Sequence, residues 1–492
     1  MSLIWSPKSS IVLAYLIAID IGTTSTKALA VDAAGNVLAS DQRFYPTHFG
    51  SGGEAEQNPE QIFDAVADLI RSINASLSAL QLEGLVFSAA MHSVMAVDEA
   101  GNPLTPLLTW ADKRAIEQAK SLAPHALLLA KATGTPVHPM SPLCKIMWWR
   151  QHNPTIFASA SKFISIKEFV VFRLTGLFLV DHSVASATGY LDIQNRVWSA
   201  RALDFMELDP GRLSQPESVY KTVALTKAAL DALRLPQAKL VLGASDGCCA
   251  QLGSGAMREG DLAITVGTSG AVRMASRFQV VPEKAQLFNF ILDDETFVFG
   301  GATNNGTSLI NWFQKLHINA ATDLSAFVAE ATTVAAGSEG LMMLPYVLGE
   351  RAPIYNAEAR GAFIGISVAH SRLHFQRALL EGICFALKDI LETIAQNGKP
   401  IDRILLSGGI TRSAQWVQML CNVLQQELHW HEQSDASAIG AAKIGFRSLG
   451  WKWSATPPVM HRVEPQKDLA HLYDRLFSKY KQLYPSLNNV SS

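Results

Sequence analysis

Short apolar runs alternate with amphipathic stretches along most of the chain. Residues 16–19 and 28–31 are apolar and flank a Gly-Thr-Thr-Ser turn, and a similar strand, Gly-Thr-Ser turn and strand recur at residues 262–274. Apolar side chains recur at helical spacing in residues 59–80, which predicts an amphipathic helix. Strand patterns that alternate with helix patterns favour an α/β fold.

Other segments extend the same alternation. Buried strands are expected at residues 84–88, 239–243 and 403–406, and a turn at residues 32–36 should lead into a further strand at 37–39. Helices are expected at residues 374–396 and 413–424, the first ending at Asn397-Gly398, a usual C-terminal signal.

The repeated strand-turn-strand unit predicts two similar domains that face each other. We expect a leader at residues 1–12, an N-terminal domain at 13–256, a C-terminal domain at 257–455 and a tail or helix at 456–492. The apolar run at the start of the N-terminal domain is shorter than the roughly 20 residues of a membrane helix, so we interpret it as a buried strand. Since no Ser/Gly/Pro-rich linker marks the boundary, the domains should pack closely.

Composition and charge exclude several classes of protein. The 492 residues are 48% apolar and carry a formal net charge of −2 from 41 Lys and Arg and 43 Asp and Glu. Such a chain is too apolar to be disordered and lacks the basic block of a dedicated nucleic-acid binder. The five cysteines include no CxxC pair, which favours packing roles in a reducing cytoplasm.

The glycine-rich turns are the first candidates for chemistry. Such a turn offers backbone N–H groups and hydroxyls to an anion, and two facing turns would clamp a polyphosphate, although either could be a plain hairpin. Neither turn matches a P-loop or a dinucleotide fingerprint. Asp20, at the end of the first strand, could hold Mg²⁺ or merely cap the turn.

Two further segments carry candidate residues. Asp246 follows the strand at 239–243, where it is either a helix N-cap or the base that takes the proton of an acceptor hydroxyl during phosphoryl transfer. Ser407-Gly408-Gly409 would let a purine lie against the backbone, a weak signal on its own. His429-Trp430-His431 lacks a third ligand and is expected to be a surface strand, while Trp148 and Trp149 are expected in the core.

Taken together, these segments resemble the FGGY carbohydrate kinases. The similarity runs from about residue 16 to residue 451 and includes the family's C-terminal signature at residues 361–381 and its N-terminal signature at 140–148, with a departure at Trp149. The resemblance implies a two-domain actin/hexokinase/Hsp70-like (ribonuclease H-like) ATPase fold with a central cleft.

The resemblance also implies the roles of individual residues. Asp246 is expected as the catalytic base, and Asp20 and Asp246 as the residues that hold Mg²⁺. ATP would be bound by Gly22, Thr23, Thr24, Ser25, Lys27, Gly267, Thr268, Asn311, Gly408, Gly409 and Ser413. The substrate would be bound by Met91, His92, Trp110, Asp112, Arg114, His138, Lys145, Lys167 and Asp246.

Within the family, the substrate segments look most like those of gluconate kinases. Xylulose kinases usually continue Gly-Gln after Met-His, where this chain has Ser93-Val94, and the Arg-Glu pair of glycerol kinases is absent. The expected reaction is therefore phosphorylation of the terminal hydroxyl of D-gluconate by ATP. A kinase for xylulose or ribulose is the alternative, and an actin-like or Hsp70-like ATPase without a sugar acceptor is a distant one.

A sugar acid needs cationic donors in its pocket. The substrate segments supply His92, Arg114, His138, Lys145 and Lys167, although each could instead be a surface or helix-capping charge. By analogy with its relatives we expect a homodimer, located in the cytoplasm. The charge and the length of the apolar runs predict no nucleic-acid or membrane partner.

Overall fold

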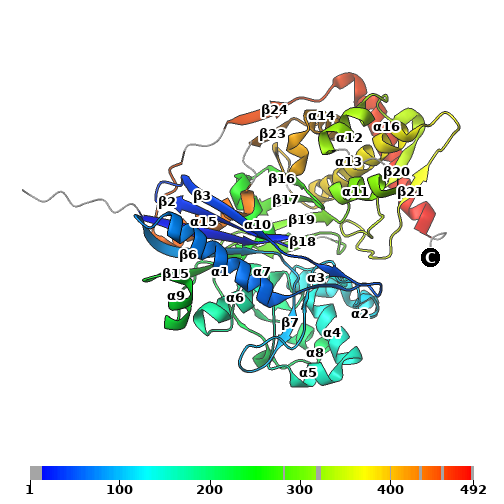
Figure 1. Ribbon diagram of the computed structural model, residues 1–492. Coiled ribbons are helices and arrows are strands. Elements are labelled where there is room, and N and C mark those ends of the chain that lie inside the picture. Colours follow the sequence, from blue (N-terminus) through cyan, green and yellow to red (C-terminus); the bar gives the residue numbers. More distant parts are fainter. Residues whose placement is uncertain are drawn as a thin grey trace, which may run out of the picture.

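The computed structural model describes residues 14–280, 283–316, 323–398, 400–431, 435–455 and 459–488 (Figure 1). The expected leader, residues 1–12, lies outside the described residues. The described chain forms two lobes, each built on a mixed sheet.

The N-terminal lobe contains a six-stranded sheet, in which β1, β6 and β15 are parallel to one another and the outer strands pair antiparallel. Its order is β14 (Thr222–Ala224), β15 (Lys239–Ser245), β6 (Gln81–Ala89), β1 (Ala14–Ile21), β2 (Ser25–Asp32) and β3 (Val37–Phe44).

The C-terminal lobe contains a seven-stranded sheet with the same sequence of pairings. Its order is β24 (Met460–Val463), β23 (Leu428–His431), β22 (Arg403–Ser407), β16 (Asp261–Val266), β17 (Gly270–Ser276), β19 (Phe297–Thr303) and β18 (Phe288–Ile291). Strands β16, β22 and β23 are parallel, and the remaining pairs are antiparallel.

The two sheets therefore repeat one topology, with β1 and β2 corresponding to β16 and β17, and β6 and β15 to β22 and β23. The prediction of two similar domains in an α/β fold is confirmed. The expected strands and helices are also present, although α1 (Pro59–Ser76) ends four residues before the predicted end. It ends there because Leu77 leaves the helical backbone conformation, with φ −116° and ψ 30°, and the chain then turns into β6.

The remaining elements of the N-terminal lobe cover this sheet or form a subdomain beside it (Figure 1). The helices are α2 (Ile116–Ser121), α3 (Ala126–Thr133), α4 (Pro142–His152), α5 (Pro154–Ser159), α6 (Ile166–Thr175), α7 (His182–Ser186), α8 (Ala200–Met206), α9 (Lys227–Leu233) and α10 (Asp246–Ser254). The short strands are β4 (His48–Phe49), β5 (Ala55–Gln57), β7 (Met95–Val97), β8 (Leu107–Leu108), β9 (Lys162–Ile164), β10 (Leu179–Asp181), β11 (Leu191–Asp192), β12 (Val197–Trp198) and β13 (Gln215–Glu217).

The C-terminal lobe is organised around one long buried helix, α13, which begins in a capping box at Ser371. Its helices are α11 (Thr307–Leu316), α12 (Leu324–Thr332), α13 (Arg372–Asn397), α14 (Ala414–Leu424), α15 (Ala436–Leu449) and α16 (Ala470–Asn488), and its short strands are β20 (Met342–Leu344) and β21 (Ala362–Ile364).

Helix α15 comes late in the chain but packs on the N-terminal sheet beside α10 (Figure 1). A β-carbon at Gly253 of α10 would lie 1.8 Å from the Ala436 carbonyl oxygen, and one at Gly440 of α15 would lie 1.9 Å from that of Cys249. Only glycine permits this backbone contact. The contact holds the helix that begins at Asp246 against the first strands of the chain.

The segment expected as a tail belongs to the C-terminal lobe over residues 459–488. Strand β24 completes the edge of the seven-stranded sheet, and Tyr473, Phe477 and Tyr480 of α16 are buried in the lobe's core. The Tyr473 hydroxyl also donates to Glu381 of α13 at 2.9 Å. The core therefore extends almost to the end of the chain.

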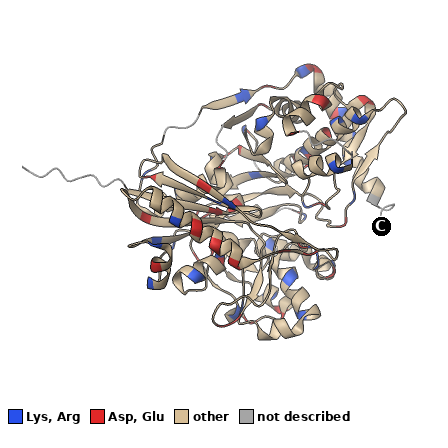
Figure 2. Ribbon diagram, viewed as in Figure 1, with Lys and Arg blue, Asp and Glu red and all other residues tan. Residues whose placement is uncertain are grey.

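Other expectations from the sequence can be placed on this fold. Trp149 is buried, Trp148 is half-buried, and all five cysteines are free and buried. The segment His429-Trp430-His431 lies in β23, between two paired strands, and the described residues hold no cluster of three or more metal-ligating side chains. Acidic and basic residues occur on both lobes (Figure 2). Among the described residues, no helix is long and apolar enough to cross a membrane.

Candidate active site

The first glycine-rich turn joins β1 to β2 at the edge where three parallel strands end. Asp20 pairs in register with Ser88 of β6 and with Lys27 of β2, and Ser88 pairs in turn with Ala244 of β15. The turn is closed by the Gly22 N–H, which donates to the Ser25 carbonyl oxygen at 3.0 Å. Polar groups from neighbouring strands therefore meet at one edge of the sheet.

Asp20 is the acidic group of this edge. Its Oδ1 accepts a hydrogen bond from the Ser88 hydroxyl at 2.7 Å. Burial, helped by the nearby carboxylates of Asp246 and Asp435, raises the pKa of Asp20 to about 6. The Ser88 hydrogen bond and the charge on Lys27 act in the opposite direction. Lys27 also forms an ion pair with Asp435, the residue before α15.

The second turn, between β16 and β17, is supported by the start of α11. The Gly306 N–H donates to the Thr268 carbonyl oxygen at 3.1 Å, and the Thr307 N–H donates to that of Gly267 at 2.8 Å. Asn311 lies one turn into α11 and is exposed. The turn is therefore anchored through its carbonyl oxygens.

Thr265 occupies the position in β16 that Asp20 occupies in β1. Both residues precede their turn glycine by two positions and pair in register with a serine, Ser407 or Ser88. The Thr265 and Ser407 hydroxyls are 2.9 Å apart. The ends of β1 and β16 thus repeat one geometry, with the carboxylate of Asp20 in the N-terminal lobe and the hydroxyl of Thr265 in the C-terminal lobe.

The glycine-rich segment after β22 lies directly against the second turn. Gly408 has a φ of +90°, and a β-carbon there would lie 2.5 Å from the Val266 carbonyl oxygen, whereas Gly409 is more open. Ser413 then caps α14, accepting from the Trp416 N–H. The segment passes close to the end of β16 because Gly408 has no side chain.

Asp246 is the first residue of α10, at the end of the parallel strand β15. The Gly247 N–H donates to its Oδ1 at 2.7 Å. Burial raises the pKa of Asp246, while this hydrogen bond and the nearby guanidinium groups of Arg273 and Arg351 act in the opposite direction. Both arginines come from the C-terminal lobe, so both halves of the chain contribute to the surroundings of Asp246.

Part of the predicted substrate set lies beside the first turn. Met91 and Trp110 line, with Gly22 and Thr23, a small hollow of about 10 Å³, and the Trp110 Nε1–H donates to Thr23 Oγ1 at 3.0 Å. His92 is buried with a φ of 66°, and its Nδ1 lies 2.7 Å from the Ala187 carbonyl oxygen.

The two histidines of this set carry little positive charge near neutral pH. Burial and the nearby cations Lys145 and Arg351 lower the pKa of His92 to about 3. Burial, followed by the charge on Arg351, holds the pKa of His138 well below its usual range. His138 Nδ1 accepts from the Met140 N–H, and its buried Nε2 has no hydrogen-bond partner within the described parts of the chain.

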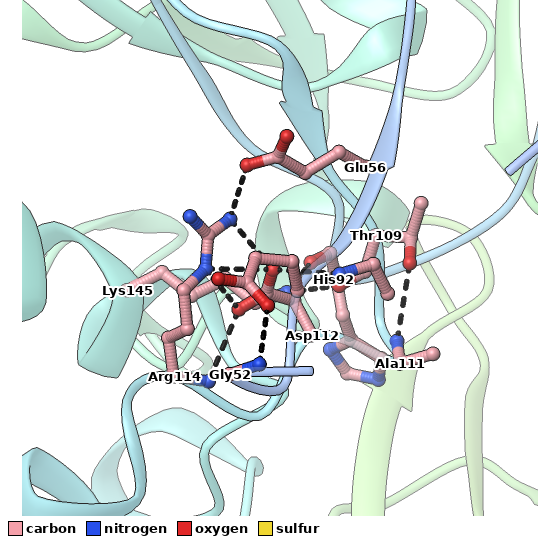
Figure 3. Close-up of polar contacts among 10 residues, drawn as sticks. Gly52, Glu56, His92, Thr109, Ala111, Asp112, Arg114 and Lys145 are labelled. Atoms are coloured by element: carbon pink, nitrogen blue, oxygen red, sulfur yellow. Dashed lines mark hydrogen bonds and ion pairs between the residues drawn. The ribbon is translucent and has the colours of Figure 1, made fainter. Parts of the chain in front are cut away.

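The other predicted cationic side chains already form hydrogen bonds or ion pairs with protein groups. Arg114 donates to both Asp112 and Glu56 (Figure 3). Its guanidinium also lies over the Trp148 ring, 4.7 Å from the centroid. Asp112 also accepts from the Ala55 N–H at 3.0 Å, so it ties three segments together.

The two buried lysines also have protein partners. Lys145 donates to the carbonyl oxygens of His92 and Thr109 at 2.8 and 2.6 Å, and burial lowers its pKa to about 7. Lys167 forms an ion pair with Asp181 at 2.8 Å and donates to the Ala244 carbonyl oxygen. Both lysines support the strand ends and loops that carry the site.

Sequence reasoning missed Arg273 and Arg351. Arg273 lies in β17, three residues beyond the second turn, where the adjacent motif could have drawn attention to it. Arg351 follows the buried Glu350 in a loop with no recognisable motif. Only the packing of the two lobes brings these arginines to Asp246.

Family models match each of the two lobes that carry the paired turns and the repeated sheets. The N-terminal domain model of the FGGY family of carbohydrate kinases matches residues 15–253, and the C-terminal domain model matches residues 262–449. The chain belongs to the FGGY family of carbohydrate kinases. It is 36% identical over 452 residues to a gluconokinase of Bacillus subtilis, a match that covers 89% of this chain and 88% of that protein.

Solved structures of family members have the same two-lobed architecture. The crystal structure of a gluconate kinase from Lactobacillus acidophilus has a TM-score of 0.90 and 30% identity, covering 96% of this chain and 98% of the other. A ligand-bound xylulose kinase from the same organism also has a TM-score of 0.90 and 30% identity, covering 97% and 99%. The chain is therefore a carbohydrate kinase, and the likeness in fold does not separate the two substrates.

Proposed function

We propose that this FGGY kinase transfers the γ-phosphoryl group of ATP to the terminal hydroxyl of D-gluconate, giving 6-phospho-D-gluconate. The observation that carries the choice of acceptor is the 36% identity to a gluconokinase along nearly the whole chain. It is supported by Ser93-Val94 after Met91-His92, where xylulose kinases usually have Gly-Gln.

ATP is the phosphoryl donor of FGGY kinases, and the paired turns suit its phosphates. Gly22, Thr23, Thr24 and Ser25 would contact them from the N-terminal lobe, and Gly267 and Thr268 from the C-terminal lobe. Gly408, Gly409, Ser413 and the exposed Asn311 remain candidates for the nucleoside side. Lys27, paired with Asp435, would contribute mainly by fixing the first turn against α15.

The carboxylates at the edge of the N-terminal sheet fit a magnesium ion. Mg²⁺ usually keeps several waters and binds one or two carboxylates together with substrate phosphates. Asp20 and Asp246 influence each other electrostatically, and Asp20 lies at the first turn. When bound there, the ion would neutralise part of the charge on the phosphates.

Asp246 would act as the base. Its position after a parallel strand and at a helix start directs the carboxylate to the edge of the N-terminal sheet where the first turn lies. Arg273 and Arg351 counter the effect of burial on its pKa and so favour the ionised form. The carboxylate can then orient the acceptor hydroxyl and take its proton during transfer.

A substrate panel tests the proposal. ADP release should be measured with gluconate, xylulose, ribulose and glycerol at equal concentrations, and gluconate should give the highest kcat/KM. A higher kcat/KM for xylulose would refute the assignment and favour the second candidate, a xylulose kinase, whose solved relative is equally similar in fold. A cytoplasmic location and a homodimer remain predictions, for which fractionation and sedimentation velocity are the measurements.

A further inference from the structure

The proposed acceptor carries a negative charge, and the sequence alone suggests five cations that could bind it. Three of these are held by protein partners. Arg114 is paired with Asp112 and Glu56, Lys145 with two carbonyl oxygens, and Lys167 with Asp181. Freeing any of them for a ligand would leave a buried or half-buried acceptor without its donor, at a cost of about 1–3 kcal/mol.

The two remaining candidates, His92 and His138, are neutral near pH 7 because burial disfavours their charged forms. They can donate or accept hydrogen bonds, but they do not balance the charge of a carboxylate. The charge must therefore come from another group that faces the cleft.

Arg273 meets this requirement. Its guanidinium donates from Nη2 to Thr265 Oγ1 at 2.6 Å, while its buried Nε has no hydrogen-bond partner in the described segments. A β-carbon at Gly247 would lie 3.6 Å from Arg273 Nη1 and 2.8 Å from Met91 Cε. The guanidinium thus lies beside Asp246 and the Met91-His92 segment, away from the tip of the second turn.

Arg351 is a second guanidinium at the same place. It donates from Nη2 to the Thr303 carbonyl oxygen at 3.0 Å, lies over the Trp110 ring at 5.2 Å, and its buried Nε also has no hydrogen-bond partner that the structure describes. The carboxylate of neighbouring Glu350 accepts from Thr303, Asn304, Asn305 and the Arg351 backbone N–H. No hydrogen bond joins that carboxylate to the guanidinium among the described contacts, although the charge of Glu350 acts on Arg351 more strongly than that of Asp246 does.

Two guanidinium groups that each keep a buried Nε without a hydrogen-bond partner among the described residues favour an anionic ligand. Burial, followed by the charge on Arg351, lowers the pKa of Arg273, so the two cations repel each other. Asp246 acts on both arginines, and Glu350 acts more strongly on Arg351. A carboxylate can accept about four hydrogen bonds, so two planar guanidinium groups can donate to it at the same time.

We propose that Arg273 and Arg351 together bind the carboxylate of the sugar acid. This inference rests on the proposed function, in which the acceptor is a sugar acid. The substrate would then contact Met91, His92 and Asp246 on the N-terminal lobe and both arginines on the C-terminal lobe. Selection of a sugar acid over a neutral sugar would thus depend on residues of the C-terminal lobe and on the approach of the two lobes.

The test compares Arg273→Met and Arg351→Met with the wild type on D-gluconate and on D-glucitol, a neutral polyol of the same length. Each variant should lower the ratio of kcat/KM for gluconate to that for glucitol by about 10- to 100-fold, the worth of a hydrogen bond to a charged group. The loss on gluconate should come mainly through its KM, while the KM for ATP changes by about twofold at most. Arg277→Met, an exposed neighbour in the chain, is the matched control and should leave the ratio unchanged.

Three results would overturn the inference. These are an unchanged ratio, an equal loss on both acceptors, and a loss confined to the KM for ATP, since the last two would place the arginines on the phosphoryl group. If a Met variant does not fold, Arg→Lys at the same position keeps the charge but loses the planar fork, and the ratio should still fall. A wild-type preference for a ketose would instead refute the proposed function before any variant is compared.

Discussion

Replacing Asp246 by Asn removes one negative charge from the cleft and leaves the side chain almost the same size. The Gly247 N–H, which donates to Asp246 Oδ1 at 2.7 Å, can donate equally to the amide oxygen of Asn. We therefore expect α10 to begin at the same residue and the variant to fold. Any loss of activity should then reflect the chemistry of the site.

The expected loss follows from the role of the carboxylate. A positioned general base contributes about 10²–10⁴-fold, which corresponds to about 3–5.5 kcal/mol. Asn cannot take the hydroxyl proton. Without the carboxylate of Asp246, the positive charges of Arg273 and Arg351 would also make it harder for any other group there to accept that proton. We expect kcat to fall about 10³-fold while the KM for ATP changes little.

The assay couples ADP release to NADH oxidation under saturating ATP and gluconate, with thermal unfolding as a check on the fold. Asp231→Asn, an exposed change on α9 in the same lobe, is the matched control and should retain full activity. A folded Asp246→Asn enzyme that kept more than about a tenth of the wild-type kcat would refute the assignment of the base.

Three other predictions follow from the site. The pKa of Asp20 near 6 means that its carboxylate is protonated as the pH falls through about 6, so the Mg²⁺ concentration needed for half-maximal rate should rise there, and Asp20→Asn should remove this dependence. Lys167→Met leaves Asp181 buried without its partner and should lower the free energy of unfolding in urea by about 3–5 kcal/mol. Gly408→Ala places a β-carbon 2.5 Å from the Val266 carbonyl oxygen at a φ of +90°, and should raise the KM for ATP more than that for gluconate.

Each of these predictions has a contrary outcome. A constant Mg²⁺ requirement between pH 5 and 8 would contradict the role of Asp20. Unchanged stability of Lys167→Met, with a raised KM for gluconate, would place that lysine on the substrate. Equal effects of Gly408→Ala on both KM values would show that the segment acts on the whole fold.

Much of the fold could be predicted from the sequence because its signals are local. Apolar runs followed by glycine-rich turns mark β1 and β16 and their neighbours, and Asn397-Gly398 marks the end of α13. Contacts between segments far apart in the chain could not be predicted. Helix α15 packs on the opposite lobe through Gly253 and Gly440, and no pattern within α15 indicates which sheet it covers.

The site divides in the same way. Residues on the turns and strand ends, such as Asp20 and Asp246, were predictable because a motif places them where parallel strands end. The partners of Lys145, Lys167 and Arg114 were not, since each contacts a group distant in the chain. A cation in a substrate segment looks the same in sequence whether it is paired or free.

By itself, the sequence determined the α/β fold, the two glycine-rich turns and the family, because each depends on short runs of residues whose conformation is set locally. Tertiary structure alone decided which charges lie near Asp246. Arg273 and Arg351 reach Asp246 only after the lobes pack, while burial removes the charge from His92 and protein partners occupy the lysines. The physical reason is that charge and hydrogen-bonding capacity depend on what surrounds a side chain, and those surroundings come from segments far apart in the chain.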